Sequence, residues 1–323
     1  MRLILLPVVG LLLSLTPVAA AHEIYVSNEK DNTVSVIDSR SLSVMRTFPV
    51  GKRPRGIAFS ADFKHLYVCA SDSDAVQVYD VSTDKHLHDL PAGVDPEQFA
   101  LSPDGRRLYI ANEDNAVTTI VDVGTRQVVG QIDVGVEPEG MAVSPDNRIA
   151  VATSETTNMA HLIDTATLKV IGNILVDQRP RFAVFTRDGA KLWEPSEIGG
   201  TLSVIDVATQ KVERTIRFEV AGVTTDNIQP VGLRLTRDGT TAFVALGPAN
   251  RVAVIDTVTM AVTKYILVGQ RVWHLALTPD DATLFTTNGV SNDVTAIDVK
   301  GLKAVKSIKV GRYPWGVAVR PTE

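Results

Sequence analysis

Short apolar runs that end in Asp recur along the chain and divide it into repeats. The first such run, SVID, ends at Asp38, and the mark returns at spacings of 42 residues with one spacing of 50. The marked residues are Asp38, Asp80, Asp122, Asp164, Asp206, Asp256 and Asp298. A second mark, usually a Pro after a Val-Gly-like turn, keeps the same register at Pro54, Pro96, Pro138, Pro180, Pro230, Val272 and Pro314. Two marks in one register predict seven copies of one unit, with eight extra residues within 217–229.

Each unit contains four short apolar stretches separated by turn sequences. Around the third unit we expect strands over 108–112, 117–122, 128–134 and 140–144. The turn sequence SPDG has Pro at the second position, where its fixed φ suits a type I turn, and Gly at the last. The repeated Asp can accept hydrogen bonds from the backbone N–H groups that follow it and so begin the next turn. A four-stranded unit of about 40–50 residues is typical of a β-propeller blade.

The two ends of the repeat array predict how the ring closes. The first apolar stretch, 24–26, corresponds to the second strand of a unit, whereas 315–319 corresponds to a first strand. We therefore expect 314–319 to join 24–50 in one blade. The predicted fold is an all-β, seven-bladed propeller of four-stranded antiparallel blades over 22–323, closed by pairing of the N- and C-terminal strands. An open solenoid would need polar capping repeats, which the sequence lacks.

Residues 1–21 have the pattern of a signal peptide. Arg2 precedes an apolar stretch, and Ala19, Ala20 and Ala21 supply small residues at the usual cleavage positions. Because Pro and Gly interrupt the apolar stretch, a membrane anchor fits less well. We expect cleavage before His22, a periplasmic location, and no membrane span in the mature chain.

Composition and missing motifs exclude several classes of protein. A formal net charge of −5 gives no basic surface for nucleic acid. The single cysteine, Cys69, allows no internal disulfide and is expected in the core. His86 and His88 alternate on an expected outer strand, and two such ligands make a weak metal site, so no metal is predicted. HExxH, GxSxG, Walker A, CxxCH and GxGxxG motifs are absent from the sequence.

Residues next to the repeated Pro point to a site at the centre of the ring. In a propeller, the loops that enter the innermost strands surround the central mouth, and here they carry charges sorted by sign. The predicted ligand-binding residues are Arg53, Arg55, Glu97, Glu139, Arg181, Arg271, Trp273, His274 and Trp315. Arg pairs with carboxylates through two parallel hydrogen bonds, and Trp offers a stacking face, so a small anionic or aromatic ligand would fit.

Two other interpretations of these residues stay open. Neighbouring loops could form purely structural ion pairs, for example Arg55 with Glu97 and Glu139 with Arg181. Alternatively, the chain could be a propeller lactonase or lyase with His274 as the base and Arg271 or Glu139 assisting. In the non-catalytic interpretation there are no catalytic residues. Trp193 is set apart, because it occupies the aromatic position of Tyr25 and Tyr67 in other units and is expected in the core.

The stretches LYVCA, LYIAN, IYVSN, TVSVID and VGxxPxG resemble the YVTN-type β-propeller repeat. Seven such repeats behind a signal peptide resemble the propeller proteins associated with PQQ-dependent alcohol catabolism. The resemblance implies an exported, non-catalytic accessory protein, whose partners would come from a quinoprotein dehydrogenase or an ABC transport system. PQQ, a tricarboxylate, would be a suitable bound ligand at the predicted mouth. The family has no established catalytic residues to carry over.

Overall fold

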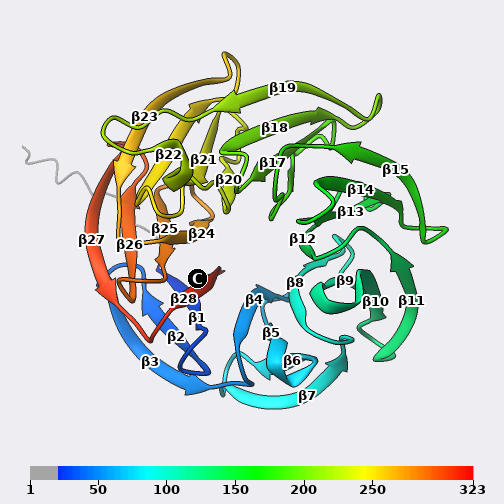
Figure 1. The fold of residues 1–323 in the computed structure, drawn as a ribbon. Helices are drawn as coiled ribbons and strands as arrows, with labels where there is room; N and C mark the ends of the chain where they lie inside the picture. The colour runs from blue at the N-terminus through cyan, green and yellow to red at the C-terminus, as the bar shows by residue number, and fades with distance from the viewer. Residues whose placement is uncertain (1–20, 323) are drawn as a thin grey trace, which may run out of the picture.

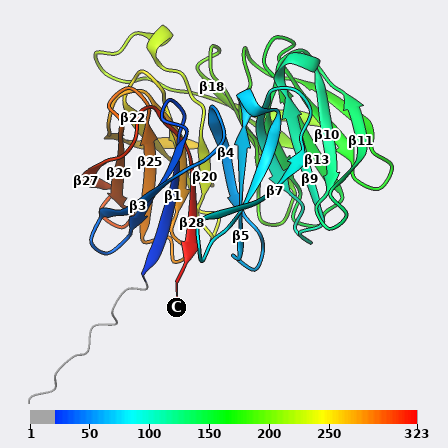
Figure 2. The same cartoon turned by 90° about the horizontal axis from the view of Figure 1, so that it is seen from below.

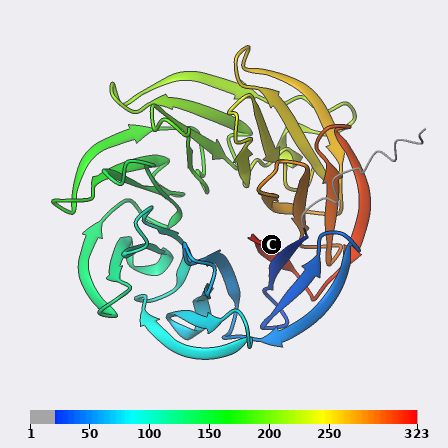
Figure 3. The ribbon, with the colours of Figure 1, turned by 180° about the vertical axis from the view of Figure 1, so that it is seen from behind.

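Seven four-stranded antiparallel sheets form a closed ring in the computed structural model, which describes residues 21–322 (Figure 1). The predicted seven-bladed propeller is confirmed. The first strands of successive blades contact one another around the centre, and the fourth strands lie on the perimeter (Figure 1, Figure 3). The signal-peptide prediction falls outside the described residues except for Ala21. Within 21–322 the structure has no helix with the length and hydrophobicity needed to cross a membrane.

The strands are given blade by blade, from the innermost outward. The closing blade contains β28 (Pro314–Pro321), β1 (His22–Asn28), β2 (Thr33–Asp38) and β3 (Ser43–Pro49). The second contains β4 (Pro54–Phe59), β5 (His65–Ala70), β6 (Ala75–Asp80) and β7 (Lys85–Pro91). The third contains β8 (Pro96–Leu101), β9 (Arg107–Asn112), β10 (Val117–Asp122) and β11 (Gln127–Asp133). The fourth contains β12 (Pro138–Val143), β13 (Ile149–Ser154), β14 (Met159–Asp164) and β15 (Lys169–Leu175).

The remaining three blades follow the same order. The fifth contains β16 (Val184–Phe185), β17 (Lys191–Ser196), β18 (Thr201–Asp206) and β19 (Lys211–Arg217). The sixth contains β20 (Leu233–Leu235), β21 (Thr241–Ala245), β22 (Arg251–Asp256) and β23 (Ala261–Leu267). The seventh contains β24 (Val272–Leu277), β25 (Thr283–Asn288), β26 (Asp293–Asp298) and β27 (Lys303–Lys309). Three single 3₁₀ turns are η1 (Ser71–Ser73), η2 (Glu113–Asn115) and η3 (Thr225–Asn227).

The repeated Asp and the SPDG sequence form the turn hydrogen bonds that their positions predicted. Asp80 Oδ1 accepts hydrogen bonds from the backbone N–H groups of Ser82 and Thr83, two and three residues on. In the SPDG turn, the N–H of Gly105 donates to the carbonyl of Ser102 over 2.8 Å. These bonds give partners to backbone N–H groups that would otherwise lack a hydrogen bond where the chain reverses.

The ring is closed without a covalent link. Strand β28 pairs antiparallel with β1, with His22 opposite Pro321 and Val26 opposite Val317. Both described ends therefore lie at one end of the ring, and the starts of the innermost strands form the mouth at the opposite end (Figure 2). The lone Cys69 is fully buried, as expected.

The eight extra residues lie where the spacing placed them, in the connection 218–232 between β19 and β20. The side chains of Phe218, Val220 and Ile228 are buried in the core between the fifth and sixth blades. The insertion is thus anchored to the ring by apolar contacts, and η3 lies at its outer turn (Figure 2).

Val317→Ala should weaken the clasp. Val317 is 4% exposed and packs with Ile24 and Val26, so its truncation leaves a cavity where the two ends meet. We expect the free energy of unfolding, measured by urea denaturation, to fall by about 2 kcal/mol. Val305→Ala, on the exposed outer strand β27, is the matched control and should change it by less than about 0.5 kcal/mol. Equal effects of the two substitutions would contradict the clasp.

Candidate functional site

Two rings of side chains surround the mouth, one on each side of the repeated Pro. The residues before it are called the rim: Arg53, Asp95, Glu137, Arg179, Gln229, Arg271 and Tyr313. The residues after it are called the charged ring, although it also contains three apolar members: Arg55, Glu97, Glu139, Arg181, Val231, Trp273 and Trp315. All nine predicted site residues belong to these rings except His274, which is one residue deeper on β24.

The rim is held in an unusual backbone conformation. Six of its seven members have positive φ, between 46° at Asp95 and 61° at Arg179, although none is Gly. The backbone N–H of Arg53 donates to Asn32 Oδ1, and that of Arg179 to Asn158 Oδ1, both 21 residues earlier. Such conformations cost free energy and persist where surrounding contacts determine them. The turn of the preceding blade therefore helps to fix where the Arg53 and Arg179 side chains enter the mouth.

A cavity of about 400 Å³ lies at the mouth. Its lining contains six cationic and three acidic side chains together with three aromatic rings. The lining residues are Glu29, Lys30, Arg53, Arg55, Glu113, Arg179, Arg181, Glu197, Arg271, Trp273, Tyr313 and Trp315. Of the predicted residues, six line this cavity, whereas Glu97, Glu139 and His274 lie behind its surface.

Glu97 is the centre of one half of the charge network. Its side chain is fully buried and contacts both Arg53, over 3.0 Å, and Arg55. Arg53 also reaches Asp72 and Asp95. The predicted pair Arg55–Glu97 is confirmed. The carboxylates of Asp95, Glu97 and Glu113 come close enough to share a cation, but Arg53 already supplies positive charge to the first two.

Arg181 is the centre of the other half. It contacts Glu139 at 2.5 Å, Glu155 at 2.7 Å and Glu197 at 3.0 Å, and all four side chains are nearly fully buried. The predicted pair Glu139–Arg181 is therefore confirmed as part of a larger cluster. Arg179 reaches Glu155 over 2.6 Å from a side chain that is 43% exposed.

Burial and charge set the protonation of these acids. Burial, opposed by Arg55 and reinforced by the neighbouring Glu139, raises the pKa of Glu97 to about 8. Burial and the charge of Glu139 also raise the pKa of Glu155. Although burial acts against its charge, Glu139 has a lowered pKa, because Arg181 lies beside it and Glu155 donates a hydrogen bond to it. Glu97 and Glu155 therefore keep their protons to a higher pH than a free Glu does, and Glu139 loses its proton at a lower pH.

The two tryptophans of the charged ring lie against arginines at the mouth. The Arg271 guanidinium lies 4.3 Å from the centre of the Trp273 ring, and the Arg55 guanidinium lies 5.6 Å from that of Trp315. His274 packs against Trp315 at 4.2 Å. Both rings thus make cation–π contacts with arginines, and stacking of a ligand on them stays a prediction.

His274 is buried below the cavity. Its ring lies between Trp315 and Phe182, it is 3% exposed, and its Nε2 is buried with no hydrogen-bond partner among residues 21–322. Burial and the charge of Arg234 lower the pKa of His274 to about 3. A histidine that acts as a general base is usually oriented by a hydrogen bond to a carboxylate. Within residues 21–322, no carboxylate makes such a bond to His274.

Four acids that sequence reasoning missed also come to the mouth. Each follows the end of a second strand, and the 42-residue register would have found them: Glu29, Glu113, Glu155 and Glu197. Their backbone N–H groups bond to the rim; that of Glu197, for example, donates to the carbonyl of Arg179 over 2.8 Å. The ends of the second strands therefore meet the starts of the innermost strands at the mouth.

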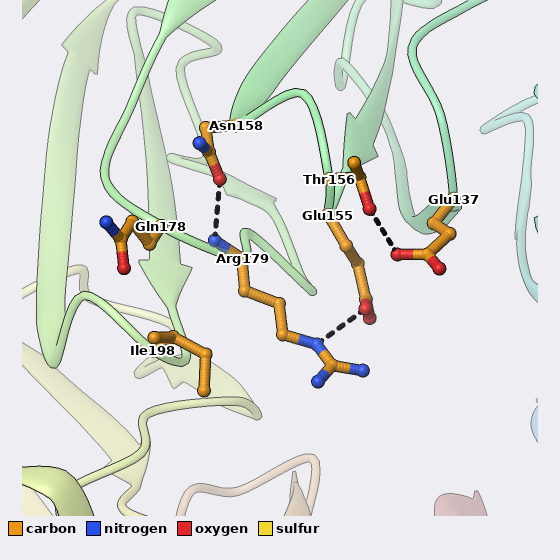
Figure 4. A pocket seen from close by; sticks show the side chains of 7 residues that line it. All are labelled: Glu137, Glu155, Thr156, Asn158, Gln178, Arg179 and Ile198. Carbon is orange, nitrogen blue, oxygen red and sulfur yellow. Dashed lines mark hydrogen bonds and ion pairs between the residues drawn. The ribbon is translucent and has the colours of Figure 1, made fainter.

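A side pocket of about 350 Å³ adjoins the central cavity (Figure 4). Arg179 lines both spaces, and Glu155 and Glu137 approach it from the preceding blade. Thr156 Oγ1 donates to Glu137 Oε2 over 2.5 Å. Ile198 adds the one apolar side chain of this lining. A ligand larger than the central cavity could extend along Arg179 into this pocket.

Comparison with known proteins supports the fold. A family model described as YNCE-like beta-propeller matches residues 8–116, and one described as Cytochrome D1 heme domain matches residues 97–181. The chain is a β-propeller protein. A search of the curated proteins finds no significant match.

Three solved structures illustrate the likeness. Kuenenia stuttgartiensis hydrazine synthase has a TM-score of 0.76 and 22% identity over 85% of this chain and 91% of that one. A functionally unknown protein from Desulfotomaculum acetoxidans DSM 771 has a TM-score of 0.79 and 15% identity, over 93% and 99%. The dihydro-heme d1 dehydrogenase NirN in complex with DHE has a TM-score of 0.69 and 17% identity, over 92% and 74%. At these identities the likeness is one of fold.

Glu97→Gln should change how stability depends on pH. The folded state raises the pKa of Glu97 from its usual 4.5 to about 8, so it binds a proton that the unfolded chain has released. The stability that this proton contributes is complete below about pH 4.5 and is lost as the pH rises to about 8. Melting temperatures across this range should fall more steeply for the natural protein than for the variant.

Glu219→Gln is the control, because Glu219 is exposed in the connection 218–232. Its pH profile should follow that of the natural protein. Parallel profiles for all three proteins would show that Glu97 is ionised throughout, and the assignment of its proton would be wrong.

Proposed function

We propose that the protein is a non-catalytic binding protein that holds a small polycarboxylate in the central cavity. The observation that carries the proposal is the set of charges in the charged ring. Val231 occupies this ring in the sixth blade, fully buried, so a blade forms without a charge there. Buried ion pairs add little to stability over apolar residues of similar size. Two arginines of the charged ring and three of the rim are gathered at one opening. This favours recognition over folding as the reason for the charges.

Three arginines of the rim are partly exposed and can donate hydrogen bonds to a ligand. Arg53, Arg179 and Arg271 have side chains that are 25%, 43% and 23% exposed, and each guanidinium has five N–H donors. Because the pKa values of Glu97 and Glu155 are raised, these two acids neutralise the arginines less than ordinary carboxylates would. A ligand with several carboxylates could engage these guanidiniums together through charge-assisted hydrogen bonds.

The enzyme alternative is less well supported. It needs His274 to remove a proton, yet the lowered pKa of this imidazole makes it a weak base, and it is buried below Trp315 without a carboxylate partner among residues 21–322. Arg271 and Glu139, its assigned helpers, are bound in the ion network. The geometry favours binding over general-base catalysis.

Two planar carboxylated molecules are the first ligands to try. PQQ, a tricarboxylate, follows from the repeat resemblance to propellers of PQQ-dependent alcohol catabolism. A carboxylated tetrapyrrole follows from the match to the Cytochrome D1 heme domain model, which spans Glu97, Glu139 and Arg181, and from the likeness to NirN. A periplasmic location and a partner from a quinoprotein dehydrogenase or an ABC transport system are part of the same proposal.

Arg179→Gln should weaken binding of PQQ. Arg179 lines both the central cavity and the side pocket, and its loss removes a charge-assisted contact at the most exposed guanidinium of the network. We expect isothermal titration calorimetry to show at least a tenfold increase in the dissociation constant.

Arg217→Gln, on the exposed outer strand β19, is the matched control and should bind as the natural protein does. A carboxylated tetrapyrrole should be titrated in parallel, because its binding would support the same site with a different ligand. Binding of neither molecule, or equal loss in both variants, would contradict the proposal.

A further inference from the structure

Three bulky side chains divide the central channel below the cavity. At the second position after the repeated Pro, Gln98, Phe182 and His274 alternate with glycines. Gln98 Nε2 donates to the carbonyl of Arg181 over 3.3 Å, and the Phe182 and His274 rings are 5.3 Å apart. Arg234 lies beyond this level, toward the chain ends, and is not among the residues that line the cavity at the mouth.

Arg234 is a charge that the ion network does not use. It lies two residues further along the innermost strands, where the other six blades have short apolar side chains: Ala58, Ala100, Ala142, Val184, Ala276 and Ala318. Its guanidinium lies 5.1 Å from the centre of the Phe182 ring, and its Nη1 donates to the carbonyl of Leu233. No carboxylate within residues 21–322 lies within 4 Å of it. Burial alone lowers the pKa of Arg234 to about 10, with no acid to oppose the shift.

A second unpartnered group lies beside it. His274 Nε2 is buried without a hydrogen-bond partner, and after burial the charge of Arg234 is the main cause of the lowered pKa of His274. Both side chains contact Phe182, one from the sixth blade and one from the seventh. A buried polar nitrogen that lacks a partner, next to a cation that lacks an anion, is costly unless something binds both.

We propose that the central channel binds a small monocarboxylate between the Arg234 guanidinium and the His274 imidazole. The guanidinium donates to the two carboxylate oxygens, and the Nε2–H of the neutral imidazole donates to one of them. Phe182, which contacts both groups, suits a short apolar tail. The inference does not depend on the proposed function, because neither Arg234 nor His274 is among the residues that line the cavity at the mouth.

The test is a titration of the protein with sodium acetate, followed by the imidazole signals in ¹H–¹⁵N NMR spectra at constant ionic strength. The chain has six histidines, so the His274 signal can be assigned with a His274→Gln variant. In the natural protein we expect a saturable shift of this signal. In Arg234→Met the apparent affinity should fall at least tenfold, and in Arg234→Lys, which keeps the charge but not the fork, it should fall less.

Arg237→Met, exposed on the same blade, is the matched control and should keep the shift. Arg179→Gln should also keep it, which separates this site from the one at the mouth. Because Arg234 has no counter-charge, its replacement by Met should not lower the melting temperature in the absence of acetate. No saturable shift, an equal shift in Arg234→Met, or an equal shift with sodium chloride would overturn the proposal.

Discussion

A four-stranded blade has two apolar faces and can cover neither of them alone. The apolar clusters accordingly lie between blades: one contains Tyr25 and Phe48 from the closing blade with Leu66 and Tyr79 from the second. Every blade thus depends on both neighbours, and the ring is stable only when closed. The pairing of β1 with β28 supplies the last interface, because it makes one blade from the two ends of the described chain.

The 42-residue register predicted the fold and part of the site, because both depend on position within a repeat. Residues one repeat apart on neighbouring innermost strands face each other, which is why Arg55–Glu97 and Glu139–Arg181 could be paired in advance. The acids that follow the second strands, Glu155 among them, obey the same 42-residue spacing. Their place at the mouth depends on how second and innermost strands meet, which the marks at Asp and Pro do not show. The role of His274 could not be predicted, because its burial depends on Phe182 and Trp315 from other blades.

The channel is divided because neighbouring innermost strands approach very closely. A Cβ on Gly140 would lie 2.7 Å from the Cα of Phe182, and one on Gly232 would lie 2.7 Å from the Cα of His274. Bulky and glycine positions therefore alternate around the ring. Seven is an odd number, so the alternation fails once, where Gly316 and Gly56 are neighbours. Trp315, next to Gly316, packs on His274 and lies beneath Arg55.

The pKa values of the buried acids bear on how the mouth would bind an anion. Carboxylates buried among arginines lose hydration, which raises the pKa of Glu97 and of Glu155 and favours their protonated forms, whereas Arg181 helps to keep the pKa of Glu139 low. The lining then has more positive than negative groups although acids are numerous behind it. An anion that entered the mouth would supply the negative charge that Glu97 and Glu155 lack when they are protonated. Affinity and proton binding at Glu97 are consequently linked: ionisation of Glu97 would compete with the anion for Arg53 and Arg55.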